Sequence, residues 1–250
     1  MKIKSMLGAV ALGMAAAPAA QAMDFGAHLW SFETKGDFQY DGDEWSADSR
    51  DGFNLDRTQD GVVWANFRHP LPILPNVKVM HTRVGTDGSG TVSGTRDFGG
   101  VTFGANEDVA ADLTLDQTDI TLYYNPLKYM PTVDLDLGLN IKYIDGDAEL
   151  RSRTTGERER TSFSGALPMA YARGGFDLPF TGLSAEAVGS LISYDGHRLE
   201  DLRAGLRYEL NAGLGIEGGY RRVRLKLDDL DDVDADLRME GPYIGLSLHL

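Results

Sequence analysis

The sequence predicts an all-β protein, a closed antiparallel up-and-down transmembrane β-barrel of about ten strands, with eight or twelve strands as alternatives. Three observations predict this class. Many segments alternate apolar and polar side chains, as half-buried strands do. After residue 22, no run of apolar residues is long enough for a membrane helix. The connections between the strand segments alternate between short apolar turns and polar, mostly longer loops.

The first 22 residues have the features of a secretory signal peptide. Lys2 and Lys4 precede an apolar run over 6–17, and Ala20-Gln21-Ala22 is a small-residue cleavage site. We therefore expect residues 1–22 to be cleaved during Sec-dependent export, so that one barrel domain covers 23–250.

The composition narrows the possible partners and the means of stabilisation. The net charge is −14, and removal of the two lysines of the leader makes it −16 (−14 − 2). Such an acidic chain is not expected to bind nucleic acid, because phosphate binding needs an excess of Lys and Arg. The chain has no cysteine, so disulfides do not hold this exported protein together.

The clearest strand is 133–143, where apolar residues at odd positions alternate with polar residues or glycine at even positions. A period of two gives the strand one apolar and one polar face, and its length suits a tilted spanning strand. The same alternation marks 183–191, 202–210 and 243–250. Weaker candidates are 24–32, 61–68, 76–84, 116–125, 162–177 and 214–227.

These segments make ten strands. An even number of strands places the N-terminus and the C-terminus of the barrel domain on the same rim. Within 214–227, the apolar parity changes between Tyr220 and Val223. This change predicts either a bulge or a strand that continues beyond the bilayer.

The connections predict which rim faces which side. The compact turns are 69–75, 126–131, 178–182 and 211–213, and the polar loops are 35–60, 85–112, 145–160, 195–199 and 228–236. In outer-membrane barrels the short turns face the periplasm. Phe67, Tyr124, Phe176 and Tyr208 lie where strands run into the short turns, as in an interfacial aromatic girdle.

Two turns carry a resemblance to a known group of proteins. The chain has His-Pro-Leu-Pro-Ile-Leu-Pro-Asn at 69–76 and Leu-Pro-Phe-Thr-Gly-Leu at 178–183, and it ends in a β-strand. It resembles a poorly characterised family of Gram-negative outer-membrane β-barrel proteins over essentially the whole mature chain. The resemblance implies a fold and a location in the cell outer membrane, but no activity.

The last strand also resembles the signal by which the barrel-assembly machinery recognises its substrates. Gly245, Leu248 and Leu250 match its glycine and hydrophobic positions. The last residue of such signals is usually aromatic, and Leu250 departs from that pattern. Recognition by this machinery is thus implied by the resemblance.

The hairpin around 211–213 predicts a charge network inside the barrel. Leu206, Tyr208 and Leu210 must share a face with Leu214 and Ile216, and a three-residue turn with Gly213 at positive φ satisfies this condition.

In that register Arg207 opposes Glu217 within pairing distance, and Arg203 opposes Arg221, a like-charge pair that needs carboxylates from other strands. The predicted network comprises Arg173, Arg203, Arg207, Arg221, Asp134, Asp136, Glu186 and Glu217.

Several motifs that suggest chemistry have simpler explanations. Residues 213–218 match G-x-G-x-x-G, but a strand composition follows where the dinucleotide fold needs a helix, so no cofactor is expected. Asp232, Asp234 and Asp236 open like an EF-hand, but its later glycine and glutamate are missing. A solvated loop or a loose cation site at the loop tip remain as alternatives.

Two further groups lie in the predicted outer loops. Arg151, Arg153, Arg158 and Arg160 could bind lipid phosphates, although the interleaved Glu157 and Glu159 favour a self-neutralised loop. Asp195 and His197 are the only pair placed for acid–base catalysis at the outer rim.

We therefore expect a non-enzymatic outer-membrane protein with a side-chain-filled interior, acting in envelope integrity or surface interaction. Its expected partners are outer-membrane lipids and lipopolysaccharide, and no cofactor or metal site is expected. A narrow diffusion channel is the first alternative. A barrel-embedded hydrolase that uses Asp195 and His197, as a protease or a lipid-modifying enzyme, is the second.

Overall fold

The computed structural model describes residues 22–40, 43–48, 54–71, 73–92, 94–98, 101–230 and 233–250. The predicted signal peptide therefore lies outside the described residues, except for Ala22. The strands are β1 (Ala22–Tyr40), β2 (Asp43–Ser46), β3 (Thr58–Arg68), β4 (Asn76–Thr82), β5 (Gly85–Val92), β6 (Arg96–Phe98), β7 (Val101–Phe103), β8 (Glu107–Tyr124), β9 (Val133–Ser152), β10 (Arg158–Leu178), β11 (Leu183–Tyr194), β12 (His197–Glu209), β13 (Leu214–Leu230) and β14 (Val233–His249).

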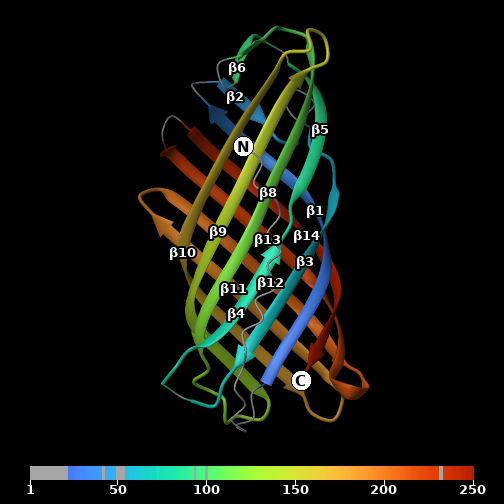
Figure 1. The fold of residues 1–250 in the computed structure, drawn as a ribbon, viewed down its shortest axis with the longest axis vertical. Coiled ribbons are helices and arrows are strands. Elements are labelled where there is room, and N and C mark those ends of the chain that lie inside the picture. Colours follow the sequence, from blue (N-terminus) through green and yellow to red (C-terminus); the bar gives the residue numbers. More distant parts are fainter. Residues whose placement is uncertain are drawn as a thin grey trace, which may run out of the picture.

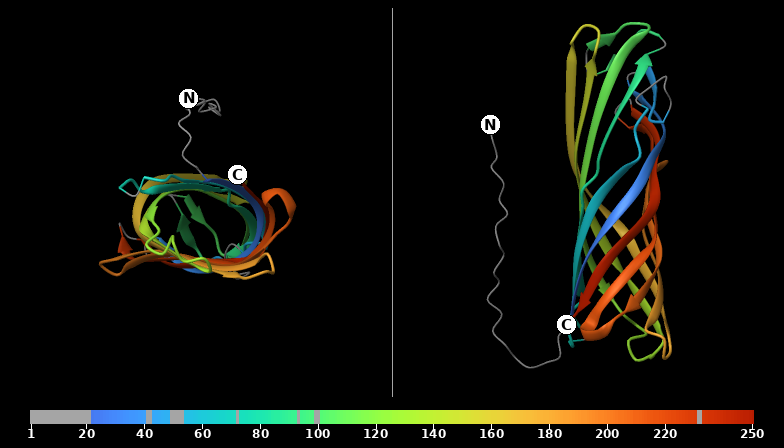
Figure 2. Two further views of the ribbon diagram at one scale, coloured as in Figure 1. Left: turned by 90° about the horizontal axis from the view of Figure 1, so that it is seen from below. Right: turned by 90° about the vertical axis from the view of Figure 1, so that its right-hand side faces the viewer.

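The strands form a closed antiparallel barrel (Figures 1 and 2). Its wall follows the order β14-β13-β12-β11-β10-β9-β8-β4-β3-β1, and β14 pairs with β1 to close it. β5 continues the position of β4 beside β8, and β2 continues the position of β3 beside β1. The wall therefore has ten positions, and the predicted fold class is confirmed.

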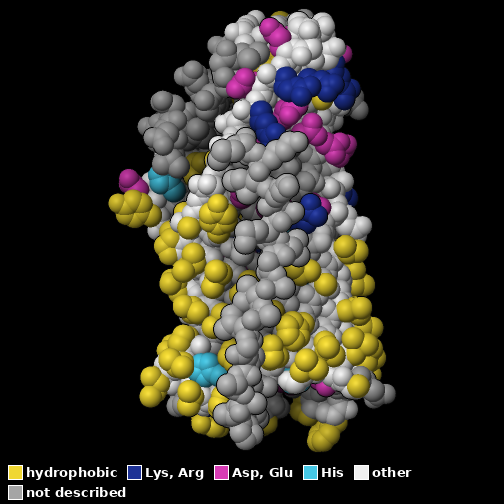
Figure 3. Space-filling model, viewed as in Figure 1, with side chains coloured by type: hydrophobic (Ala, Val, Ile, Leu, Met, Phe, Trp, Pro, Cys, Tyr) yellow, Lys and Arg dark blue, Asp and Glu magenta, His cyan; other side chains and the backbone are white. Residues whose placement is uncertain are grey.

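The wall turns apolar side chains outward, and Figure 3 shows them as a broad belt below the charged upper end. On β9, Leu137, Leu139 and Tyr143 are 44–47% exposed, whereas the alternating Asn140 and Lys142 are buried inside. Every second residue of a strand faces the same way, so one strand supplies both the belt and the interior.

The two rims differ as expected from the connections. The turns after β3, β8, β10 and β12 lie at one end, together with both termini of the barrel. There the backbone N–H of Met23 donates to Leu250 O and that of Leu250 donates to Met23 O. The structure contains no helix, among the described residues, long and apolar enough to cross a membrane.

Above the belt, β8, β9 and β10 continue as a tall sheet that stands beyond the rest of the wall (Figure 2). The prediction of loops over 85–112 and 145–160 was wrong for most of these residues, because β5, β8, β9 and β10 occupy them. The extension has its own small apolar core, formed by Trp45, Val92, Phe103, Val109, Ala111 and Leu150.

The β12–β13 hairpin has the register that the turn chemistry predicts. Arg207 pairs with Glu217 and Arg203 with Arg221. The three-residue turn 211–213 has positive φ at Gly213, as expected, and also at Ala212. The register of β13 runs through Tyr220 and Val223 without a shift, so no bulge explains the change in parity there.

Candidate functional site

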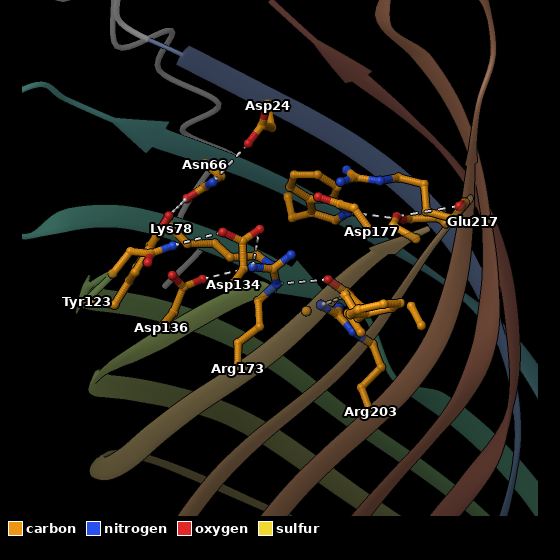
Figure 4. A pocket seen from close by; sticks show the side chains of 18 of the residues that line it. Asp24, Asn66, Lys78, Tyr123, Asp134, Asp136, Arg173, Asp177, Arg203 and Glu217 are labelled. Atoms are coloured by element: carbon orange, nitrogen blue, oxygen red, sulfur yellow. Dashed lines mark hydrogen bonds and ion pairs between the residues drawn. The ribbon is translucent and has the colours of Figure 1, made fainter. Parts of the chain in front are cut away.

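The interior of the barrel is the candidate site, because polar side chains from most strands converge there. In the half near the short turns, Arg173 of β10 lies at the centre (Figure 4). Its Nε donates to Glu186 at 3.0 Å and its Nη1 to Asp136 at 3.0 Å, while Asp134 lies 4.0 Å away. Arg203 Nη2 donates to the other oxygen of Glu186 at 3.3 Å. Glu186 therefore bridges two arginines on different strands.

Glu217 belongs to the same half of the interior but has partners that the sequence did not suggest. Its Oε1 accepts a hydrogen bond from Trp64 Nε1 at 3.3 Å and lies 3.4 Å from His28 Nδ1. Trp64 is on β3 and His28 on β1, so this contact crosses the seam that closes the barrel.

A second group of charges lies nearer the middle of the barrel. Lys142 Nζ, which has no exposed surface, lies 2.9 Å from both Asp119 and Asp201 and donates to Gln117 at 3.1 Å. Arg221 forms a bidentate pair with Asp201, with distances of 3.0 and 2.7 Å. Two cations and two carboxylates thus balance in a buried cluster.

Arg221 also contacts residues on the long-loop side of this cluster. Its Nη1 donates to Thr82 at 3.0 Å, and its guanidinium stacks 4.7 Å from the ring centroid of Trp30. A planar guanidinium can hold a carboxylate bidentately and stack on an aromatic ring, which an ammonium group does not match.

An apolar layer then fills the interior towards the long-loop side. Its buried members are Trp30, Phe32, Val62, Val84, Met169, Leu199, Val223, Met239 and Tyr243, and the half-buried Met80, Leu115, Ile144, Leu167, Ile192 and Leu225 pack against them. Every wall position contributes to this layer. The parity change on β13 therefore marks the height at which the interior changes from charged to apolar.

A small polar cavity of about 80 Å³ remains beside the Arg173 cluster, lined among others by Lys78, Asp136, Tyr171 and Arg203. Drug-sized ligands occupy cavities of roughly 300–1,000 Å³. This one has room for several water molecules. Arg203 Nε and Asp136 Oδ1, on two of its lining residues, have no hydrogen-bond partner among the described residues.

The structure distributes the eight residues of the predicted network over three places. It brings Arg173, Arg203, Glu186, Asp136 and Asp134 together around the bridging Glu186. Arg221 lies instead with Asp201 of β12. Arg207 and Glu217 are in register, yet no ion pair involving Arg207 occurs among the described residues, because Glu217 turns to Trp64 and His28.

The main residues that the sequence reasoning missed are Lys142, Asp119, Asp201 and the apolar layer. The polar face of 133–143 already contained Lys142, and its even position could have assigned it to the interior. The charged interior predicted from the sequence occupies only the part of the barrel nearer the short turns, and the apolar layer fills the part nearer the long loops.

The candidate catalytic pair at the outer rim is not assembled. Asp195 and Gly196, both at positive φ, form the tight turn between β11 and β12. His197 Nδ1 accepts a hydrogen bond from the backbone N–H of Asp228 at 3.1 Å. No bond between His197 and Asp195 is seen, and no group of three or more metal-ligating side chains occurs among the described residues.

The acidic and basic loop motifs are largely engaged within the protein. Asp232 lies outside the described residues, and Asp236 forms a bidentate pair with Arg224. Arg158 pairs with Glu149 at 3.5 Å and Arg160 with Asp147 at 2.9 Å.

No model of a known protein family and no curated protein matches the chain. Among solved structures, it is similar to the outer membrane protease OmpT from Escherichia coli, with 13% identity, a TM-score of 0.48 and coverage of 92% of this chain and 97% of that one.

The translocator domain of the autotransporter NalP from Neisseria meningitidis matches with 12% identity, a TM-score of 0.45 and coverage of 92% and 88%. Ail of Yersinia pestis, in complex with a heparin analogue, matches with 11% identity, a TM-score of 0.37 and coverage of 91% and 99%. These likenesses carry no argument about function, and the barrel fold rests on the chain's own strand pairing.

Proposed function

We propose that this chain is an integral outer-membrane protein with a sealed, non-conducting and non-enzymatic barrel, which serves envelope integrity or surface interaction. The observation that carries the proposal is a closed ten-position wall with an apolar belt outside and a filled interior. The expected signal peptide supplies the route of export.

The closed wall and the belt support the membrane location. In lipid every backbone polar group must find a partner within the protein, and a closed antiparallel barrel meets this condition. The exposed aromatics Tyr124, Phe176 and Tyr208 lie at the short-turn end of the belt, where an interfacial girdle is expected. The short turns would then face the periplasm.

The filling of the interior argues against a diffusion channel. A solute would have to pass the Arg173 cluster, the Lys142–Asp201–Arg221 cluster and the apolar layer in succession. Barrels of this size have interiors that side chains can fill. The enzyme alternative lacks its candidate pair, because Asp195 and His197 are not joined within the part of the chain that the structure describes.

Lipopolysaccharide is the proposed lipid partner, and a row of cations just above the belt supports it. Arg224, Arg238 and Lys35 oppose one another across β13, β14 and β1. Directly opposed like charges destabilise a sheet unless anions compensate them. Asp236, Glu240 and Glu33 each pair with one member, and lipid phosphates would add to that compensation.

The proposed contact with the barrel-assembly machinery concerns β14. Gly245 is half-buried and lies among the inward-facing positions of this strand, while Leu248 and Leu250 are exposed. This pattern is compatible with the signal that the sequence resembles.

Cell fractionation and gel migration test the location. The protein should sediment with outer membranes and migrate faster on a gel without boiling than after boiling, because a closed barrel stays compact in detergent. Recovery as a soluble periplasmic monomer without detergent would contradict the proposal.

Planar-bilayer recording tests the sealing separately. The refolded protein is expected to show no steady conductance at neutral pH, with a known porin as the positive control. A stable ohmic conductance from the parent protein would show that the interior opens, and the sealed-barrel proposal would fail while the membrane location stood.

A further inference from the structure

The tall sheet above the belt has one open edge, along the upper part of β10. β10 pairs with β9 over its whole length, up to Arg158 opposite Arg151. Its pairing with β11 ends at Ala170 opposite Leu191. Among the described residues, residues 158–169 therefore have a strand on one side only, and those from 160 to 166 are all exposed.

The opposite edge of the same sheet, along β5, is covered. Leu55 forms a bridge with Gly88 of β5, and the backbone N–H of Asp56 donates to Asp87 O at 2.9 Å. Asn54 Nδ2 donates to Ser89 O and Thr86 Oγ1 to Asp56 O. Uncovered edges are templates for pairing with another chain.

Pro168 indicates which backbone groups point to the open side. The ladder with β9 continues unbroken through Pro168 opposite Ile141, so its nitrogen, which carries no hydrogen, faces away from β9. In an antiparallel strand, alternate residues point their N–H and C=O to the same side. Ser162 and Ser164 share the parity of Pro168 and therefore present free donors and acceptors on the open edge.

The side chains along this edge specify the chemistry of an added strand. On the outer face Arg158 and Arg160 are more than half exposed, although they pair with Glu149 at 3.5 Å and with Asp147 at 2.9 Å. Arg151, which opposes Arg158, has no ion pair among the described residues. On the inner face Phe163 is 51% exposed and Leu167 packs against the apolar layer. A strand with acidic residues on one face and apolar residues on the other complements both.

A second copy in the same membrane does not fit this edge as an antiparallel strand. This step rests on the proposed membrane location. Two copies that stand upright in one membrane are related by an axis along the membrane normal, so their β10 strands rise in the same sense. Every neighbour in this barrel is antiparallel, and antiparallel pairing is the more stable arrangement.

We propose that the open edge of β10, residues 158–167, is a docking site for an extended acidic and apolar segment of another protein, which adds to the sheet as an antiparallel strand. Backbone hydrogen bonds to Ser162 and Ser164 would give affinity, and contacts with Arg158, Arg160 and Phe163 would give selectivity. The incoming strand would run upward, with its acidic residues in its C-terminal half.

The test uses the full-length folded protein in detergent, so that its outcome does not depend on the membrane location. The probe is a fluorescent ten-residue peptide that alternates valine with threonine and has aspartate at its last two polar positions. A peptide with lysine in place of aspartate is the control. Fluorescence anisotropy measures binding, and amide hydrogen exchange followed by mass spectrometry locates it.

The matched variants are Ser162→Pro, which removes the outward N–H, and Ser162→Ala, which keeps it. Ser162→Ala should bind like the parent, and Ser162→Pro should weaken binding about tenfold, the equivalent of one or two lost hydrogen bonds. Exchange should slow over 158–168 when the aspartate peptide binds. Arg158→Glu with Arg160→Glu should invert the preference between the two peptides, and this variant carries the test if Ser162→Pro does not fold.

Three results would overturn the proposal. In the first, the aspartate peptide does not bind. In the second, it binds, but Ser162→Pro and the charge reversal leave its affinity unchanged. In the third, the protein without peptide is a dimer in which amide exchange over 158–168 is already slow. The last result would make a second copy the occupant.

Discussion

Lys142 shows how a single residue holds the interior together. Its ammonium group is fully enclosed. Its partners come from β8, which neighbours β9, and from β12, which is three positions away along the wall. A buried charge is costly unless it is paired and hydrogen-bonded, and here Asp119, Asp201 and Gln117 supply both. The residue therefore ties distant parts of the wall to one another.

Replacement of Lys142 by methionine should lower the free energy of unfolding by about 3 kcal/mol, because it leaves a buried carboxylate without its partner. The measurement is urea unfolding in lipid vesicles, followed by gel migration of the unboiled protein. Ser190→Ala is the matched control. Ser190 is buried near the same cluster, and its side chain accepts one long hydrogen bond, from Asn140 Nδ2 at 3.4 Å, among the described residues. A loss below about 1 kcal/mol is therefore expected. Equal losses would contradict the assigned role.

Glu107 makes the tall sheet sensitive to acid. Hydrogen bonds from Ser152 Oγ and from the backbone N–H of Gly104 lower the pKa of Glu107 below its ordinary value of 4.5. A lowered pKa in the folded state gives stability that is present above the ordinary pKa and is lost as the pH falls through the folded one.

The upper ends of β8 and β9 should therefore loosen below about pH 4.5, the ordinary pKa of this group, while the barrel below them stays closed. Limited proteolysis with pepsin at pH 3 and pH 4.5 measures the effect. Glu107→Gln should remove most of the difference between the two pH values, and Glu157→Gln is the control. A difference that persists in Glu107→Gln would assign the sensitivity to another group.

At the scale of the element, β9 shows how one strand serves lipid, interior and solvent in turn. Its outward residues are apolar from Leu137 to Tyr143 and acidic at Asp145 and Asp147, while its inward residues change from charged to apolar at about the same height. The outward change marks the upper rim of the belt.

The same substitution at two heights of β9 tests the position of that rim. Leu137→Arg should reduce stability by about 2–4 kcal/mol, the cost of a cation on the lipid face near the midplane. Asp145→Arg, on the same face of the same strand, should be neutral within about 0.5 kcal/mol. Asp145 opposes Asp116, so an arginine there relieves a like-charge pair.

Folding yield in vesicles and urea midpoints measure both variants, and equal effects would mean that the belt is not in lipid. A substitution at Gly138, which neighbours Leu137 on the opposite face of β9, is unsuitable as a control for Leu137→Arg. A Cβ there would lie 2.0 Å from the carbonyl oxygen of Leu122.

The strands of the belt were predictable, whereas their extensions were not. Alternation is strong only where one face meets an apolar environment and the other a polar one, as on 133–143. Above the belt, the outward face of β9 and β10 is in solvent, and the inward face mixes small or polar residues such as Ser152 and Thr161 with apolar ones such as Leu150. Those segments have the composition of loops, and only long-range pairing makes them strands.

At the scale of the whole molecule, closure and the grouping of the short turns with both barrel termini on one rim followed from the even strand number and the two kinds of connection. The register of the β12–β13 hairpin also followed, because parity and turn length allow few solutions. The partners inside the barrel did not follow. Arg221 pairs with Asp201, two residues from its register partner Arg203 on the neighbouring β12, and donates to Thr82, which comes from β4 across the interior. The sequence pattern gives the face of each residue but not its height in the barrel.

The seam between β1 and β14 has a consequence for the order of folding. It joins the first and last strands of the barrel, so the chain between them must be confined before the seam forms, at the largest loop-closure entropy of any strand pair. The other wall neighbours are closer to each other in the chain, with β2 between β1 and β3 and with β5, β6 and β7 between β4 and β8, so they can pair earlier. The seam should therefore form last and open first. The contact between Glu217 and His28 would then form late in folding, when the open curved sheet closes into a barrel.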